Sequence, residues 1–230
     1  MAFVKNAAEI AHTLMAMDSP RLNNLAEAYQ IVISFLVQYP NAASQPKDKG
    51  APAIGTTEYI EKQAHSFALS RNPKAPQEPA TVPDEMVSVI LNEYFGVPAS
   101  DLERIKKGHS LSMGAENLVG DLLERYLAKV LEPQGWIWCS GSMVKAVDFI
   151  KPPSDERGLW RMLQVKNRDN SENSSSSAIR DGTTIEKWFR TFSKKVGSNW
   201  TEFPDTTLRQ QLSEEDFKIF VRQYLKALKP

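Results

Sequence analysis

The N-terminal half of the chain places apolar residues at three- and four-residue steps, which is the spacing of amphipathic helices. Helices are expected over residues 6–17, 19–39, 57–69, 84–96 and 100–108. Residues 40–83, which surround the third of these helices, are rich in proline and predict a linker or a meandering loop. The pattern therefore indicates a helical N-terminal region.

The pattern changes after Met113. A strong amphipathic helix is expected there, ended by Pro133 and Gly135. Its apolar face consists of Val119, Leu122, Leu123, Tyr126, Leu127 and Val130. Three strand-like runs follow over 136–139, 143–150 and 159–166, and two further helices are expected over 183–196 and 213–227. A helix, a three-stranded meander and more helices predict a fold of the α/β or α+β class.

Charge adds one local feature to this picture. The 230 residues carry 28 basic and 28 acidic side chains, so the chain as a whole shows no preference for a polyanion. Residues 160–195 differ, because eight basic side chains stand there against four acidic ones. A local excess of positive charge is typical of a surface that binds phosphates.

Several classes of protein are excluded. The single cysteine, Cys139, rules out an internal disulfide framework and fits a reducing compartment. The apolar run at 31–37 is too short to span a membrane, and the N-terminus lacks the layout of a signal peptide. We therefore expect a cytoplasmic protein without a membrane partner. The histidines are isolated and no nucleotide-binding glycine motif is present, which argues against a zinc enzyme or a dinucleotide enzyme.

Candidate chemistry lies on the second and third predicted strands. Side chains alternate along a strand, so Gln164 and Lys166 share one face while Val165 points to the other. An antiparallel hairpin can bring Asp148 beside them. The Asp148 carboxylate, the Gln164 amide oxygen and the Val165 carbonyl form an all-oxygen donor set that suits Mg²⁺. Lys166 can then polarise an attacking water or hold a scissile phosphate.

This constellation resembles a known nuclease core. Asp148, followed by Gln164-Val165-Lys166, resembles the PD-(D/E)xK motif, with glutamine in the second acidic position. The stretch "VKNRDNSENSSSSAIRDGTTIEKWFR" is similar to the loop and helix after the catalytic lysine in type II restriction endonucleases of the SinI type. The resemblance implies a restriction-endonuclease-like core, with a central mixed sheet flanked by helices.

The resemblance also implies an activity. It predicts a homodimer that cuts double-stranded DNA at GGWCC with Mg²⁺. A cognate methyltransferase would act on the same site without needing to bind the enzyme. The motif departs from the family pattern in two places, since Val147 replaces the proline and Gln164 replaces a carboxylate. A helix acid can restore the lost charge. Glu116 lies nearer the apolar face and Glu124 has the shorter spacing to the first strand, so the choice between them stays open.

The polar segment after Lys166 carries the residue types that read DNA. Arginine pairs with guanine, asparagine with adenine and glutamate with cytosine, while serine holds phosphates. The candidates for DNA contact are Arg168, Asn170, Glu172, Asn173 and Arg180. Lys187 and Arg190 are expected one turn apart on the next helix, where they suit phosphate contacts. These residues define a predicted recognition segment over 167–190.

The chain is expected to divide into a helical region, 1–110, and a nuclease core, 111–230. The helical region can complete a dimer or clamp DNA. Two other functions compete with restriction. One is a structure-selective repair or recombination nuclease on the same core. The other is a DNA-binding protein that has lost cleavage, because Gln164 weakens the metal site.

Overall fold

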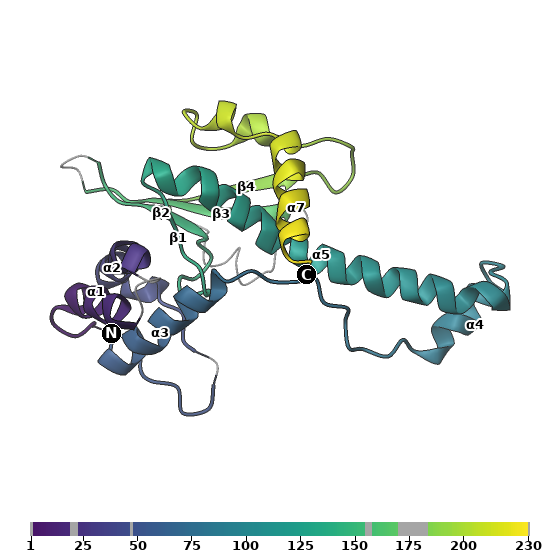
Figure 1. Ribbon diagram of the computed structural model, residues 1–230, viewed down its shortest axis with the longest axis horizontal. Coiled ribbons are helices and arrows are strands. Elements are labelled where there is room, and N and C mark those ends of the chain that lie inside the picture. Colours follow the sequence, from purple (N-terminus) through teal and green to yellow (C-terminus); the bar gives the residue numbers. More distant parts are fainter. Residues whose placement is uncertain (1, 19–22, 47, 155–157, 170–183, 230) are drawn as a thin grey trace.

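A computed structural model describes residues 2–18, 23–46, 48–154, 158–169 and 184–229. Figure 1 shows a central sheet with helices on both sides and a long helical arm that projects from the body. This mixed α/β architecture confirms the fold class expected from the sequence. No helix in the described part of the chain combines the length and the apolar character needed to cross a membrane.

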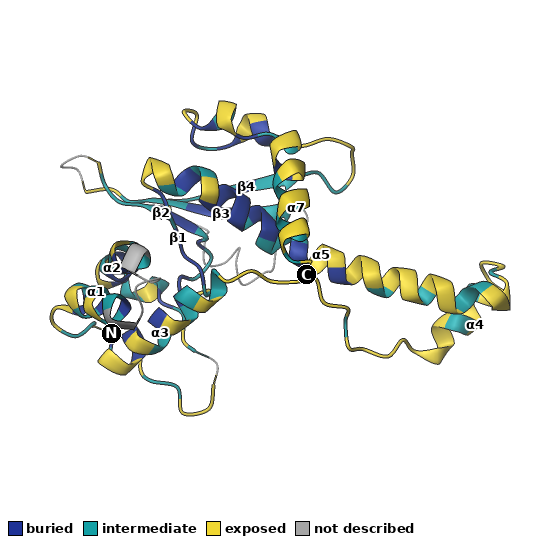
Figure 2. Ribbon diagram, viewed as in Figure 1, coloured by how far each residue is buried: buried dark blue, intermediate teal, exposed yellow. Residues whose placement is uncertain are grey.

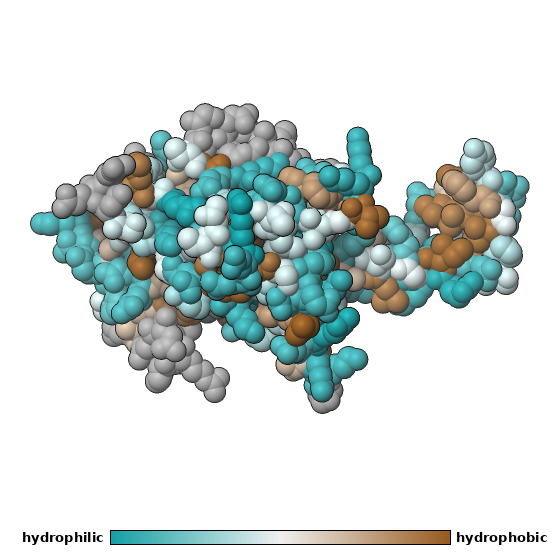
Figure 3. Space-filling view, turned by 90° about the horizontal axis from the view of Figure 1, so that it is seen from above, coloured by the Kyte–Doolittle hydropathy of each residue, from teal (hydrophilic) through white to brown (hydrophobic). Residues whose placement is uncertain are grey.

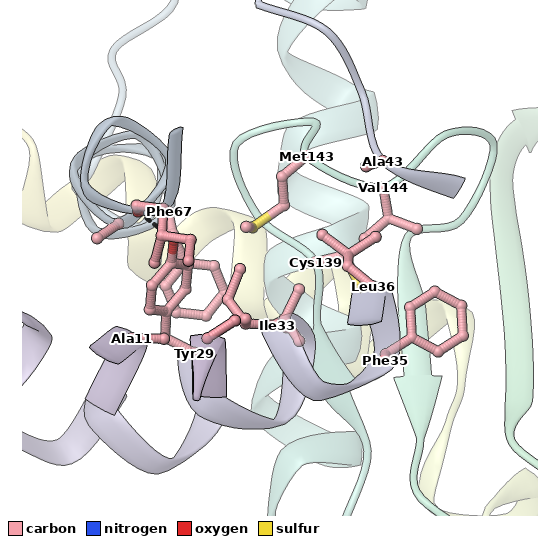
Figure 4. Close-up of a cluster of buried hydrophobic side chains, with 14 of the residues drawn as sticks. Ala11, Tyr29, Ile33, Phe35, Leu36, Ala43, Phe67, Cys139, Met143 and Val144 are labelled. Carbon is pink, nitrogen blue, oxygen red and sulfur yellow. Dashed lines mark hydrogen bonds between the residues drawn. The ribbon is translucent and has the colours of Figure 1, made fainter. Parts of the chain in front are cut away.

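The N-terminal helices pack against one another and against the sheet. They are α1 (Ala7–Asp18), α2 (Asn23–Gln38) and α3 (Thr57–Ser70), close to their predicted bounds. The Thr56 side chain caps α3 by accepting a hydrogen bond from the backbone of Tyr59. Figure 4 shows the apolar core under these helices, where Tyr29 and Phe67 meet Met143 from the segment before the second strand. The predicted N-terminal helices are confirmed.

The sheet has four strands in the described residues, in the order β1-β2-β3-β4. They are β1 (Ile137–Trp138), β2 (Phe149–Lys151), β3 (Arg161–Arg168) and β4 (Ile185–Thr191). The first three form the predicted antiparallel meander, and β4 joins the free edge of β3 in parallel. The sheet is therefore mixed.

The helix expected over 183–196 was a wrong prediction, because Ile185–Thr191 within this segment form strand β4. Its β-branched and aromatic residues favour a strand, and β3 offers an edge of unpaired backbone groups. Trp188 pairs in register with Val165 and is 1% exposed. Burial of this indole in the sheet core outweighs the helical spacing that the sequence shows.

The second predicted strand is much shorter than expected. Only its last two residues belong to β2, and Asp148 stands directly before β2 instead of near its end. Ala146 has a φ of 55°, a left-handed conformation that breaks the pleat of a strand. Val144, two residues before Ala146, forms an isolated β-bridge with Ala43. The backbone at Val144 therefore pairs with the N-terminal region.

The two helices expected over 100–108 and after Met113 are one helix, α5 (Leu102–Leu131). Its C-terminal half covers one face of the sheet, where Leu123 and Leu127 pack beside Leu163 and Val165. Its N-terminal half leaves the body and packs beside α4 (Glu85–Glu93), forming the projecting arm (Figures 1 and 2). The continuity of α5 couples this arm rigidly to the sheet.

The remaining helices complete the described structure. α7 (Glu214–Ala227) packs on the C-terminal half of α5 through Phe217, which joins the same core. Short 3₁₀ helices cover Pro40–Ala42, Ala99–Asp101, Glu132–Gln134, Trp200–Glu202 and Arg209–Gln211. Four of the five tryptophans, Trp136, Trp138, Trp188 and Trp200, are core residues.

Candidate active site

An open cleft of about 1350 Å³ lies between α3 on one side and α5 with β3 on the other. One wall comes from α3 and from residues 44–46 and 48, and the other comes from α5 and β3. The irregular segment 138–148 lines the cleft between these walls. The cleft contains Glu124, Asp148, Gln164 and Lys166, so the structure brings together four of the residues that the sequence singled out.

The backbone fixes Asp148 firmly on both sides. Its N–H donates to the carbonyl of Leu163 at 2.9 Å, and its carbonyl accepts from the N–H of Cys139 at 2.8 Å. The side-chain Oδ2 accepts from the backbone N–H of Val165 at 2.7 Å. The carboxylate therefore lies beside β3, as the predicted hairpin required, and one oxygen is held by the backbone of β3 itself.

The alternation along β3 is as predicted. Gln164 is 2% exposed and lines the cleft together with Lys166, whereas Val165 belongs to the apolar core under α5. In a strand, the N–H and C=O of one residue point to the same neighbour. The carbonyl of Val165 therefore faces the edge where its N–H binds Asp148, next to the cleft.

The structure separates the two candidate helix acids. Glu124 lines the cleft, and its Oε2 accepts a hydrogen bond from Nε1 of Trp138 at 2.9 Å. Burial and the nearby negative charge of Asp148 raise the pKa of Glu124 to about 8. Glu116 is exposed on α5 and is not among the residues that line the cleft. The geometry therefore favours Glu124 as the acid that accompanies Asp148.

The pKa of Asp148 is also raised, but by a smaller amount than that of Glu124. Burial raises its pKa to about 6, although the Val165 N–H and the positive charge of Lys166 both work to lower it. Lys166 therefore lies close enough to stabilise the ionised form of Asp148. The charge of Asp148 raises the pKa of Glu124, so the two carboxylates repel each other, and a bound cation would relieve that repulsion.

The donor chemistry of this site fits a magnesium ion. Within the described residues, no group of three or more His, Cys, Asp and Glu side chains is placed to hold a metal. Mg²⁺, however, is usually held by one or two carboxylates, with waters and substrate phosphates filling the other positions. Glu124 and Asp148 supply the carboxylates, and the Gln164 amide and Val165 carbonyl supply neutral oxygens. A bound Mg²⁺ would lower the pKa of water and neutralise charge on a phosphate.

The structure describes only some of the residues predicted to contact DNA. Asn170, Glu172, Asn173 and Arg180 lie outside the described residues. Arg168 is exposed at the end of β3.

Lys187 and Arg190 lie on strand β4, so the predicted helix with one turn between them was wrong. Lys187 is in register with Gln164 and shares its face of the sheet. Arg190 donates to Glu214 at 2.6 Å and to Asn167 at 3.0 Å, and it stacks on the ring of Phe217. With a side chain that is 13% exposed, Arg190 ties β4 to α7.

Sequence reasoning missed a supporting network around Trp138. Arg71 binds Glu132 through two hydrogen bonds, at 3.1 and 2.7 Å, and donates to the carbonyl of Trp138 at 3.0 Å. The guanidinium also lies 5.1 Å from the Trp138 ring. No local motif marks these residues, because they are distant in the chain. Only the packing of α3 beside β1 reveals that Arg71 and Glu132 fix the tryptophan that holds Glu124.

The cleft also has lysines that the sequence did not single out. Lys62 and Lys74 come from the N-terminal region and Lys145 from the segment before Asp148. Lys62 pairs with Asp48 at 2.5 Å, and Lys74 pairs with Asp121 at 3.0 Å. The N-terminal region therefore contributes lysines to the cleft wall, far in sequence from the basic segment 160–195, and acidic neighbours balance two of them.

The chain is similar to known proteins over nearly its whole length. Residues 7–227 match the family model described as SinI restriction endonuclease. The type II restriction enzyme Eco47I from Escherichia coli is 54% identical over 225 residues, which cover 97% of this chain and 96% of that enzyme. The type II restriction enzyme SinI from Salmonella infantis is 52% identical over 228 residues, covering 99% and 97% of the two chains.

Proposed function

This chain belongs to the SinI restriction endonuclease family, and from that premise we propose that it is a type II restriction endonuclease that cuts double-stranded DNA at GGWCC. The single observation that carries the proposal is the meeting of Glu124, Asp148 and Lys166 in one cleft. A phosphodiester hydrolase needs carboxylates for a divalent cation and a positive group for the scissile phosphate. These three side chains supply both.

Each residue has a distinct proposed role. Asp148 and Glu124 would hold Mg²⁺, assisted by the Gln164 amide oxygen and the Val165 carbonyl. Lys166 would orient the attacking water and stabilise the charge that develops on the phosphate. Lys166 lines the cleft and its positive charge acts on Asp148, so its ammonium would lie near the scissile phosphate. Because Gln164 stands where the family motif has an acid, Glu124 would supply the second negative charge of the site, beside Asp148.

The assembly and cellular setting follow from the substrate. A nearly palindromic DNA site has two equivalent strands, and two copies related by a two-fold axis would present one catalytic centre to each strand. We therefore propose a homodimer. It would act in the cytoplasm beside a methyltransferase that protects the same sites. The recognition segment 167–190 would read base edges, with Arg168 and Arg180 as candidates for guanine.

We also propose which part of the chain carries which function. Residues 111–230 would carry the catalytic groups and the recognition segment. The helical region 1–110 would supply a wall of the DNA cleft through α3 and through Lys62 and Lys74. Clusters of cleft lysines are suited to the phosphate backbone, because each neutralised phosphate releases counterions.

A plasmid digest tests the proposal. Purified protein is incubated with a plasmid that has two GGWCC sites, and with a matched plasmid in which both sites are altered by one base pair. Discrete fragments from the first plasmid only, in Mg²⁺ and not in EDTA, are expected. The Asp148→Asn variant serves as the control for contaminating nuclease. Cutting of branched DNA alone would indicate a structure-selective nuclease, and binding without cutting would indicate a DNA-binding protein.

A further inference from the structure

The projecting arm, defined as residues 79–113, has an apolar surface that the described chain leaves uncovered. It comprises the segment before α4, α4 itself, the connection to α5 and the first part of α5. Helix α4 has nine residues and none of them is buried. A helix of this length is marginal in water unless its apolar face is packed. Packing of that face against a partner would therefore stabilise the arm.

The uncovered surface is large. Ten large apolar side chains of the arm are exposed: Val82, Met86, Val87, Val89, Ile90, Tyr94, Phe95, Ile105, Leu111 and Met113. Figure 3 shows hydrophobic side chains gathered on the arm, apart from the largely polar body. Their exposed area is on the order of 1,000 Å², compared with about 800 Å² on each partner of a standard interface. The arm alone is large enough for a stable dimer.

Charge shows which partner suits this surface. The arm has five acidic side chains and three basic ones, so its net charge is −2. All three basic side chains already pair with acids: Arg104 with Asp101, Lys106 with Glu103 and Lys107 with Glu78. A negative, apolar surface repels the phosphate backbone, which a DNA clamp would have to bind. The observations therefore favour a protein partner over DNA.

The shape of the arm fits a second copy of the arm. A groove of about 450 Å³ lies between α4 and α5, lined by apolar residues that include Val87, Leu91 and Met113. The far end of the arm carries Tyr94 and Phe95, with rings 5.0 Å apart and exposed fractions of 82% and 66%. Aromatic anchors that fill apolar pockets dominate the energetics of many interfaces. One arm thus offers both an anchor and a pocket.

We propose that the arm is the dimerisation surface, and that it pairs with the arm of a second copy of this chain. In a two-fold pair, the aromatic end of each arm would occupy the groove of the other. This inference rests on the proposed function in one respect, since cutting both strands calls for two copies. Because α5 is continuous from the arm to Glu124, pairing of the arms would fix the distance between the two catalytic clefts.

Sedimentation equilibrium of the full-length protein without DNA tests the proposal. The expected mass is twice the 25.9 kDa of one chain. Tyr94→Ala with Phe95→Ala should weaken self-association by about 30-fold or more, and Ile90→Glu should give monomers. Leu159→Glu is the matched control, because Leu159 is 70% exposed outside the arm. It should leave the mass unchanged. Circular dichroism should show that every variant keeps its helical content.

Three outcomes would overturn the proposal. They are a wild-type monomer at tens of micromolar, a dimer that survives Ile90→Glu, and arm variants of unchanged mass that bind DNA less tightly. The last would make the arm a DNA clamp. These readouts are independent of cleavage. A dimer that depends on the arm but cuts no plasmid would contradict the proposed function and leave the interface in place.

Discussion

The indole N–H of Trp138 donates to Oε2 of Glu124 at 2.9 Å and so fixes the carboxylate that faces Asp148. Trp138 is itself held at three points. Its carbonyl accepts from Arg71, its backbone N–H donates to Glu132 at 3.2 Å, and the guanidinium of Arg125 lies 5.4 Å from its ring. The position of Glu124 thus depends on contacts that extend from α3 to α5.

Removing that indole donor should affect metal affinity more than folding. In Trp138→Phe the ring still packs, but Glu124 loses its positioning hydrogen bond. Groups that orient metal ligands typically contribute 10- to 100-fold to metal affinity or activity, so we expect the Mg²⁺ concentration for half-maximal cleavage to rise about tenfold. Titration of cleavage against Mg²⁺ measures this shift.

Trp188→Phe is the matched control for this variant. Trp188 is equally buried, but its Nε1 donates to the carbonyl of Asn199, away from Glu124. Trp188→Phe should lower the temperature of unfolding without changing the Mg²⁺ concentration for half-maximal cleavage. Equal Mg²⁺ curves for Trp138→Phe and the wild type would show that the bond to Glu124 is only structural.

Asp148→Asn should remove cleavage while preserving the fold. The amide oxygen of asparagine can still accept from the N–H of Val165, whereas alanine would leave that donor unpaired. The loss of a charged metal ligand should lower the cleavage rate by about three orders of magnitude. Single-turnover rates and gel-shift affinity are measured on the same preparation. Cleavage at a normal rate by the purified variant would contradict the assignment of Asp148.

Lys166→Met should reduce the rate more than the affinity. Methionine keeps the aliphatic bulk and removes the ammonium, which is proposed to act on the transition state more than on bound DNA. We expect single-turnover cleavage to fall by roughly 1000-fold with less than about a threefold change in the Kd for DNA. If affinity and rate fell by the same factor, Lys166 would be a phosphate contact only.

Lys187 and Arg190 should behave differently although both were expected to contact phosphate. Lys187 shares a face with Gln164, and Lys187→Ala should weaken binding to all DNA and reduce the slope of log K against log salt by about one unit. Arg190 binds Glu214 and Asn167. Its replacement by alanine leaves Glu214 without this partner and should cost about 1–3 kcal/mol of stability with the salt slope unchanged. Salt-dependent binding and urea unfolding separate the two effects.

Asp205 should give the protein a defined acid sensitivity. The residue is 5% exposed and accepts hydrogen bonds from Trp136 at 3.1 Å and from Arg161 at 3.0 Å. Burial alone would raise the pKa of Asp205, but bonds from Thr207 and Trp136 and the charge of Arg161 outweigh it, so the pKa lies below its ordinary range. A lowered pKa means that the stabilisation is present above about pH 4, the ordinary value, and is lost as the pH falls through the folded-state pKa.

The variant Asp205→Asn isolates this contribution. It should unfold more easily than the wild type at pH 7, by about 1–3 kcal/mol, because Arg161 and Trp136 lose a charged acceptor. The difference should shrink as the pH falls below about 4, because the carboxylate takes up its proton first in the unfolded state and, at lower pH, in the folded state. Urea unfolding at pH 7, 5 and 3 measures the trend. A difference that stays constant across this range would exclude titration of Asp205 as its cause.

Local periodicity in the sequence is enough to predict which side chains of a single helix or strand are buried. The three- and four-residue spacing placed Leu122, Leu123 and Leu127 on the buried face of α5, since helical geometry maps that spacing onto one side. The two-residue alternation of β3 likewise placed Gln164 and Lys166 in the cleft and Val165 in the core. Both results follow from the backbone geometry of single elements.

Tertiary structure decided everything that depends on competition between distant segments. The spacing of 183–196 permits a helix, but the open edge of β3 and the burial of Trp188 select a strand. The sequence left Glu116 and Glu124 equivalent, and only the packing of α5 beside Trp138 selects Glu124 for the cleft. The physical reason is the same in both cases: hydrogen-bond pairing and burial free energy are gained between elements, and local spacing does not encode which distant partner supplies them.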